Sequence, residues 1–197
     1  MKNRILIISG GISKERLISL DTGLQVSKEL RKNSYHVKIS EPNNNLENNI
    51  KKFKPDIIFN ALHGQFGEDG YMQTILERFK IPYTHSGPIP SAIAMDKEIS
   101  KKLFIKHKIN TPKFLTYSFD MKNSQLLKLI YSKLKFPVVV KPLNEGSSVN
   151  VFICNKKNIF NILNSLKNYK KVMIEEFIGG REIQVAILGK RKLGAIE

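Results

Sequence analysis

Lys141 stands at the end of a predicted strand, directly before a small polar loop. The β-branched residues Val138–Val140 favour a buried strand that delivers this lysine. The loop Glu145–Ser148, of sequence EGSS, is too small and polar for a core, and a second β-like run, Val149–Cys154, follows it. A cation beside a glycine–serine loop can hold an anion, most often a phosphate, because main-chain N–H groups and hydroxyls come close to it. The alternative is a hairpin with a hydrophilic turn, and no GxxxxGK[ST] phosphate loop is present.

Glu15 lies near the start of the first predicted helix, after a strand and a glycine turn. Arg4–Ile8 has the apolar sequence RILII of a buried strand, and apolar residues then recur at helical spacing, at Leu17, Leu20 and Leu24. Strand, turn and helix open a βαβ unit, although the GxGxxG fingerprint is absent. The carboxylate of Glu15 can favour the helix dipole. It can equally point into the crevice at the carboxyl end of the strand, where open α/β sheets bind ligands.

A second loop with candidate chemistry follows the strand predicted over Asp56–Leu62. The strand ends at His63, and the following residues 65–70, QFGEDG, hold two glycines and two carboxylates. Such a loop directly after a strand is typical of a functional site. The alternative is a turn that begins the helix predicted over Tyr71–Phe79, with Asp69 as its N-cap. Both interpretations can hold at once.

The first half of the chain alternates strands and helices. Short strands are predicted over Tyr35–Ile39 and Ile81–Thr84, and Glu41–Asn49 is interpreted as a polar connection. Lys97 then begins a helix with apolar residues on one face, at Ile99, Leu103 and Phe104. On the residues alone, this lysine is a solvated residue at a helix start. We place the domain boundary here, with residues 1–95 as an α/β domain and residues 96–197 as a second domain.

The second half combines two amphipathic helices with extended segments. The apolar positions of these helices lie at Leu126, Leu127, Ile130 and Leu134, and at Ile159, Phe160, Ile162, Leu163 and Leu166. The extended segments are Phe114–Tyr117, Val172–Ile174, Arg181–Leu188 and Leu193–Ile196.

Composition limits the class of protein. The chain has 197 residues, 41% hydrophobic and 25% charged, which are globular values. The single cysteine, Cys154, forms no internal disulfide, and we expect a reducing, cytoplasmic setting. No signal peptide or membrane-spanning run is recognised. The net charge of +16 allows nucleic-acid binding, but the lysines are spread along the chain, so neither nucleic acid nor membrane is expected as a partner.

Four stretches together resemble the D-alanine–D-alanine ligases of the ATP-grasp superfamily. They are SGGISKERLISL (residues 9–20), FNALHGQFGEDGYMQTILE (59–77), SGPIPSAIAMDKEISKKLF (86–104) and PVVVKPLNEGSSVNV with the later VMIEEFIGGREIQVAIL. The pair LHGxxGEDG and KPxxEGSS is specific for this ligase within the superfamily. The resemblance implies an α/β fold with a Rossmann-like N-terminal domain, then an incomplete ATP-grasp domain. Its first subdomain spans residues 112–178 and its second begins at 179–197.

The family joins two D-alanines for peptidoglycan synthesis. ATP phosphorylates the first D-alanine, and the amine of the second attacks the acyl phosphate. The resemblance assigns the ammonium of the first D-alanine to Glu15, and a hydrogen-bonded set around the substrate to Glu15 and Ser147, with His63 on the substrate side. Catalysis then depends on positioning and electrostatics, with no covalent nucleophile.

The resemblance also implies an ATP site in the second domain. Lys97 and Lys141 are expected on the triphosphate, with the loop Glu145–Asn150, including Gly146 and Ser148, folded over it. The adenine is expected at the hinge formed by Glu175, Glu176, Phe177 and Ile178. Glu182 is expected to accept hydrogen bonds from the ribose hydroxyls.

Two departures from the family stand out. Asn150 occupies a position where the family usually has glycine, and asparagine tolerates positive φ better than most residues. The family's chain also continues about half as far again. That part holds the ligands for Mg²⁺ or Mn²⁺, so metal ligands are expected only beyond residue 197, and we expect the 197-residue chain alone to be inactive.

Two alternatives stay open. One is a related carboxylate–amine ligase with another acceptor, such as D-lactate or D-serine. The other is a non-catalytic basic remnant. Full-length members of the family are expected to form homodimers.

Overall fold

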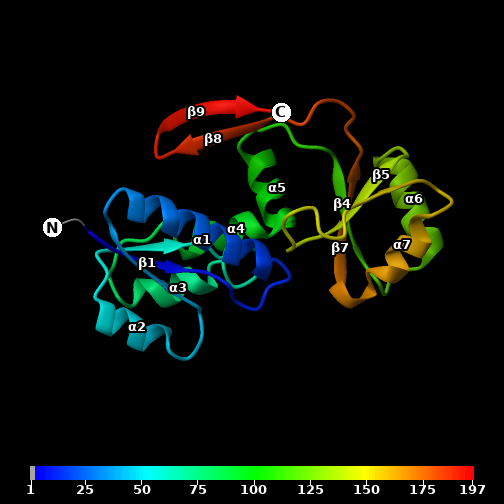
Figure 1. The fold of residues 1–197 in the computed structure, drawn as a ribbon. Helices are drawn as coiled ribbons and strands as arrows, with labels where there is room; N and C mark the ends of the chain where they lie inside the picture. Colours follow the sequence, from blue (N-terminus) through cyan, green and yellow to red (C-terminus); the bar gives the residue numbers. More distant parts are fainter. Residues whose placement is uncertain (1–2) are drawn as a thin grey trace.

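Strand β1, Arg4–Ile8, is the centre of a three-stranded parallel sheet of order β2-β1-β3, with β2 at His36–Ser40 and β3 at Ile57–Asn60. Both faces of β1 are buried, which is why its sequence is continuously apolar. Leu6 and Ile8 pack against helices α2, Leu46–Phe53, and α3, Tyr71–Glu77. The structure is a computed structural model that describes residues 3–197 (Figure 1).

Helix α1, Arg16–Lys32, covers the other face of this sheet, above Ile5 and Ile7. The predicted helix is confirmed, but its buried residues are Ser19, Gly23 and Ser27, while Leu17 and Leu24 are exposed. A Cβ on Gly23 would lie 2.6 Å from the Ser9 Cβ. Small residues therefore let α1 approach β1 closely.

The predicted polar connection over Glu41–Asn49 is wrong in its second half, because α2 begins at Leu46. Only Leu46, Ile50 and Phe53 give this short helix an apolar face, and the asparagines between them hide the pattern. The extended segment Ile81–Thr84 contributes only one parallel bridge, from Tyr83 to Ile58.

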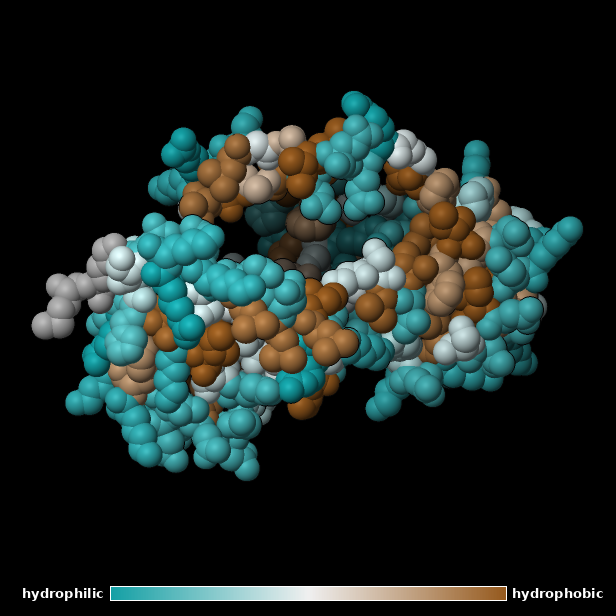
Figure 2. Space-filling model, viewed as in Figure 1, coloured by the Kyte–Doolittle hydropathy of each residue, from teal (hydrophilic) through white to brown (hydrophobic). Residues whose placement is uncertain are grey.

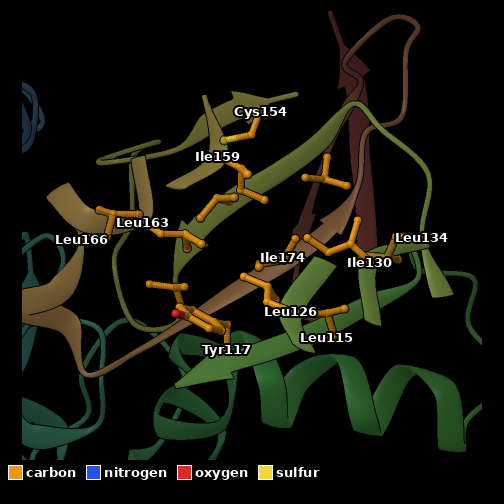
Figure 3. Close-up of a cluster of buried hydrophobic side chains, with 13 residues drawn as sticks. Leu115, Tyr117, Leu126, Ile130, Leu134, Cys154, Ile159, Leu163, Leu166 and Ile174 are labelled. Carbon is orange, nitrogen blue, oxygen red and sulfur yellow. The ribbon is translucent and has the colours of Figure 1, made fainter. Parts of the chain in front are cut away.

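The second sheet is antiparallel, of order β4-β7-β5-β6. Its strands are β4 (Phe114–Ser118), β5 (Val138–Pro142), β6 (Phe152–Cys154) and β7 (Lys171–Glu176). Helices α6, Asn123–Lys133, and α7, Ile159–Ser165, pack on it through a core that contains Leu126, Ile130 and Ile159 (Figure 3). Both predicted amphipathic helices are confirmed. The Cys154 thiol lies in this core, where burial raises its pKa to about 11.

Helices α4, Pro88–Met95, and α5, Lys97–Lys106, connect the two sheets (Figure 1). No residue is shared between the buried clusters of the two sheets. The boundary at residue 95 stays a prediction.

The last two strands, β8 (Gln184–Leu188) and β9 (Arg191–Ile196), form an antiparallel hairpin. Its side chains are exposed, including those of Ile187, Leu188 and Ile196, and Figure 2 shows hydrophobic surface on this hairpin. The α/β fold with a parallel N-terminal sheet, expected from the sequence, is thereby confirmed, and the second half is antiparallel.

Candidate functional site

Three segments meet at the junction of the two sheets: the start of α1, the loop after β3, and the loop between β5 and β6. The N-terminus of α5 completes the site, because the main-chain N–H of Lys97 donates to the Leu143 carbonyl over 3.1 Å. Residues from both halves of the chain therefore line one crevice.

The Glu15 carboxylate is buried in this crevice. The residue is 7% exposed, and its side chain makes no hydrogen bond or ion pair within residues 3–197. Both oxygens lie against the β5–β6 loop, because a Cβ on Gly146 would be 3.7 and 3.8 Å from them. The carboxylate does not cap its own helix, which favours the crevice interpretation over the dipole one. A buried carboxylate without a cation is costly, so this position suits a cationic ligand.

Gly64 makes room for this carboxylate from the opposite side. A Cβ at Gly64 would lie 2.2 Å from Glu15 Oε2, and its φ of +66° favours glycine. The position of the Glu15 carboxylate therefore explains on steric grounds why a glycine follows His63 in the LHG sequence.

His63 lies beside Gly64 and contacts α1. Its Nε2 is 3.0 Å from the Thr22 hydroxyl, and its carbonyl accepts a hydrogen bond of 2.8 Å from the Ser13 hydroxyl. Glu68 Oε2 accepts the Gly64 N–H over 2.7 Å, which fixes the loop. The Asp69 carboxylate accepts from Tyr71 N over 3.0 Å, so it caps α3 although Gly70 is the N-cap residue.

Lys97 extends from the start of α5 toward the β5–β6 loop. Its Nζ donates to the carbonyls of Leu143 (3.2 Å) and Glu145. Loss of hydration on burial, and then repulsion from Lys141, lower the pKa of this lysine below 10.5. An anion between the two lysines would relieve that repulsion.

Glu175 holds two lysines at once. One carboxylate oxygen accepts from Lys141 and the other from Lys101, and Glu175 is 7% exposed. The carboxylate therefore fixes the Lys141 ammonium at the edge of the crevice, and its oxygens are both occupied.

A cavity of about 550 Å³ contains both Lys97 and Lys141, a size typical of small-ligand sites. Its other lining residues are Glu68 from the loop after β3, Ala94 and Met95 from α4, and Glu145, Gly146, Ser147, Ser148 and Val151 from the β5–β6 loop. A second cavity, of about 400 Å³, lies in the N-terminal half, and its lining includes Leu46, Met72 and Phe79 together with Ser13 and His63. The cavity with the two lysines is the better site for a phosphate, because charge-assisted contacts hold phosphate oxygens most strongly.

The serines of the β5–β6 loop have left-handed backbones. Ser147 and Ser148 have φ of 45° and 56°, and both are exposed. Asn150 has a φ of 57°. This confirms that asparagine supports a positive φ there.

The predicted adenine and ribose residues lie outside this cavity. Phe177 and Ile178 follow β7, are 42% and 65% exposed, and make no main-chain hydrogen bond to the described part of the chain. The Glu176 N–H donates to the Lys113 carbonyl. Glu182 is exposed before β8 without a polar partner among residues 3–197. The structure thus brings Glu15 and Ser147 close to the two lysines, whereas His63 lines the second cavity and Glu182 lies away from both cavities.

Three residues at the site were missed by the sequence analysis: Lys14, Lys101 and Tyr169. Lys101 is four residues after Lys97 and hence on the same helix face. That spacing was the available signal, but the apolar residues of α5 drew attention to another face. Ile99 and Phe104 on that face are 45% and 42% exposed.

Residues 3–197 contain no group of three or more His, Cys, Asp or Glu side chains able to hold a metal ion. These residues therefore do not fit a metal by themselves. Within the same residues, no helix has the length and hydrophobicity needed to cross a bilayer.

The two-sheet architecture, with a lysine pair and a glycine–serine loop at the junction, defines an ATP-grasp protein. Residues 38–86 match the family "D-ala D-ala ligase N-terminus", and residues 103–197 match "D-ala D-ala ligase C-terminus". The chain belongs to the D-alanine–D-alanine ligase family.

Individual relatives agree with this assignment. The D-alanine–D-alanine ligases of Pelagibacter ubique and Rickettsia canadensis are 67% and 38% identical over the whole chain, which spans 65% and 54% of their lengths. The crystal structure of the Bacillus anthracis D-alanine–D-alanine ligase complexed with ATP is similar, with a TM-score of 0.82 and 34% identity. That similarity covers 98% of this chain and 65% of the Bacillus one.

Proposed function

We propose that this chain carries the ATP phosphate site and the first D-alanine site of a D-alanine–D-alanine ligase acting in peptidoglycan synthesis. The observation that carries the proposal is the buried Glu15 carboxylate, which has no ion-pair partner among residues 3–197, beside a cavity with two lysines. The Glu15 carboxylate suits an ammonium group, and the two lysines suit a triphosphate. An amino acid and ATP are the two donor-side reactants of such a ligase.

The proposed reaction begins with the first D-alanine between Glu15 and the phosphates. The Glu15 carboxylate binds its ammonium, and Ser147 and His63 orient it, so its own carboxylate faces the γ-phosphate. A carboxylate oxygen attacks the γ-phosphorus while the bond to the β–γ bridging oxygen breaks. The products are ADP and D-alanyl phosphate.

Lys97 and Lys141 stabilise the charge on the phosphates during this transfer. The loop Glu145–Asn150 excludes water from the acyl phosphate, which would otherwise hydrolyse. The amine of the second D-alanine then attacks the acyl carbon, inorganic phosphate leaves and the amine loses a proton. D-alanine is favoured as acceptor over D-lactate or D-serine because the relatives bear the name D-alanine–D-alanine ligase.

We assign the adenine and ribose of ATP to the end of β7 and the segment that follows it. Glu175–Ile178 hold the adenine and Glu182 the ribose, which requires the segment after β7 to close on the nucleotide. Phe177 and Ile178 are exposed and make no main-chain hydrogen bond to the described residues, which supports the hinge role. Mg²⁺ or Mn²⁺, a homodimer and a cytoplasmic setting are expected of the whole enzyme.

Ligase turnover tests the proposal. Residues 1–197 would be joined to the remaining part of the Pelagibacter ubique ligase, and ADP and dipeptide would be measured together. We expect both products, and a loss of kcat/KM of about 100-fold in Glu15→Gln and in Lys141→Ala, because each removes a charged partner of a reactant.

Exposed positions supply matched controls for these variants. Glu29→Gln on α1 and Lys106→Ala on α5 make the same chemical changes away from the crevice, and we expect both to retain activity. Unchanged kinetics in Glu15→Gln or Lys141→Ala would refute the corresponding role. A product containing D-lactate or D-serine in place of the second D-alanine would favour the related ligase.

A further inference from the structure

The loop between β5 and β6 is held in an unfavourable backbone geometry. Ser147, Ser148 and Asn150 all have positive φ, a conformation that costs free energy in residues with a side chain. Inside the loop, Val149 N–H donates to the Gly146 carbonyl over 2.9 Å and Val151 N–H donates to the Ser148 carbonyl over 3.3 Å. Such local bonds are accessible to water at an exposed loop, so contacts from outside are needed to hold this geometry.

The Tyr169 hydroxyl joins the two ends of this loop. It donates to Glu145 Oε1 over 2.8 Å and accepts the side-chain amide of Asn150 over 2.7 Å. The Lys14 ammonium donates to the same hydroxyl over 2.8 Å. A hydroxyl has one donor and two acceptor sites, so all of its capacity is used.

Lys14 connects the loop to the other half of the chain. Its ammonium also donates to Glu145 Oε1 over 2.6 Å, and it directly precedes Glu15. An exposed ion pair contributes little alone, but the half-buried Glu145 and the Tyr169 hydroxyl make it part of a network. The pKa of Lys14 is raised, first by its hydrogen bond to Glu145 and then by that to Tyr169.

We propose that Lys14, Glu145, Asn150 and Tyr169 form a latch that positions the β5–β6 loop against Glu15. The latch keeps Gly146 close to the Glu15 carboxylate. These are positioning residues, because they act through the loop that carries Ser147 and Ser148. Asn150 supports a left-handed backbone and adds a bond to Tyr169. The inference rests on the proposed function only in assigning that loop to ATP.

Hydrogen exchange of the 197-residue chain without nucleotide tests the latch. Tyr169→Phe removes three hydrogen bonds and Lys14→Met removes two. In both variants we expect the exchange rates of the Val149 and Val151 amides to rise by at least about tenfold, which is the effect of losing one hydrogen bond. Lys14→Arg keeps the charge and a donor and should restore protection. Tyr131→Phe is the matched control, because the Tyr131 hydroxyl has no hydrogen-bond partner among residues 3–197.

The thermal midpoint separates positioning from general stability. We expect it to stay within a few degrees in every variant, and exchange to change only in residues 144–151. In the double variant Lys14→Met with Tyr169→Phe, the Val149 and Val151 amides should exchange at most about twofold faster than in Tyr169→Phe. The reason is that both changes break the same network. Exchange rates in Tyr169→Phe equal to those in Tyr131→Phe would overturn the latch, as would a rise in exchange throughout the chain. Because no nucleotide is present, neither result depends on whether the chain binds ATP.

Discussion

Lys97 combines partial burial with a neighbouring positive charge. Its ammonium is held by main-chain carbonyls, and no carboxylate within residues 3–197 forms an ion pair with it. The folded state therefore binds a proton at Lys97 more weakly than the unfolded state does, where the pKa is 10.5. Between the lowered pKa and 10.5 the unfolded chain holds more protons, so the contribution of this group to stability increases as pH rises. It is lost as pH falls through the folded-state pKa.

Binding of a triphosphate should reverse this shift. A phosphate near Lys97 favours the charged ammonium, so we predict that ATP binding takes up protons at alkaline pH just below 10.5. Calorimetric titration in two buffers of different ionisation enthalpy measures the uptake. Lys97→Arg is the control, because its guanidinium stays charged and should take up none. Identical enthalpies in the two buffers for the unmodified chain would contradict this role.

At the scale of elements, helix α1 positions Glu15 by packing on the sheet through small residues. The Ser19 hydroxyl donates to the Ala61 carbonyl over 2.7 Å and accepts the Gly10 N–H over 2.8 Å. These bonds connect the helix to the ends of β1 and β3. Gly23 allows the close contact with Ser9. The position of Glu15 therefore depends on a row of small buried residues on α1, which a hydrophobic pattern in the sequence does not show.

A methyl group at Gly23 should therefore destabilise the fold. Alanine gains about 1 kcal/mol in helix propensity over glycine, but overpacking costs about 1–3 kcal/mol. We predict a net decrease in the thermal midpoint of Gly23→Ala, of about 2–6 °C. Lys28→Ala, on the exposed face of the same helix, should leave the midpoint unchanged. A higher midpoint in Gly23→Ala would show that the contact with Ser9 relaxes freely.

The sequence predicts elements with strong periodicity and misses those whose pattern depends on tertiary contacts. The run RILII and the helix with Leu126 and Ile130 are confirmed, because burial of apolar residues dominates both. Helix α2 was missed because three apolar residues among asparagines carry little signal. The face of α5 was misread because Lys101 is buried by Glu175, a residue 74 positions away.

At the scale of the whole molecule, the candidate site exists only where the two halves of the chain meet. Glu15 stands at the start of α1 and His63 in the loop after β3, both in the first half of the chain, while Lys141 and the β5–β6 loop belong to the second half. Two ion pairs on one face of α5 join it to the second sheet, from Lys171 to Glu98 over 2.6 Å and from Lys101 to Glu175. Motif residues were therefore predictable one by one, whereas their common crevice, and the contacts of Lys14 and Tyr169, required the packed structure.

The cavity that contains Lys97 and Lys141 is the proposed binding site for the phosphates of ATP. Calorimetric titration of ATP into the 197-residue chain tests it directly, in the unmodified chain and in the double variant Lys97→Ala with Lys141→Ala. We predict measurable binding of ATP to the unmodified chain. In the double variant we expect the affinity for ATP to fall by about 100-fold or more, because two charged hydrogen-bond donors are lost. Lys106→Ala with Lys128→Ala removes the same charge from exposed positions and should bind ATP like the unmodified chain. Equal ATP affinity in the unmodified chain and the Lys97, Lys141 double variant would contradict the claim.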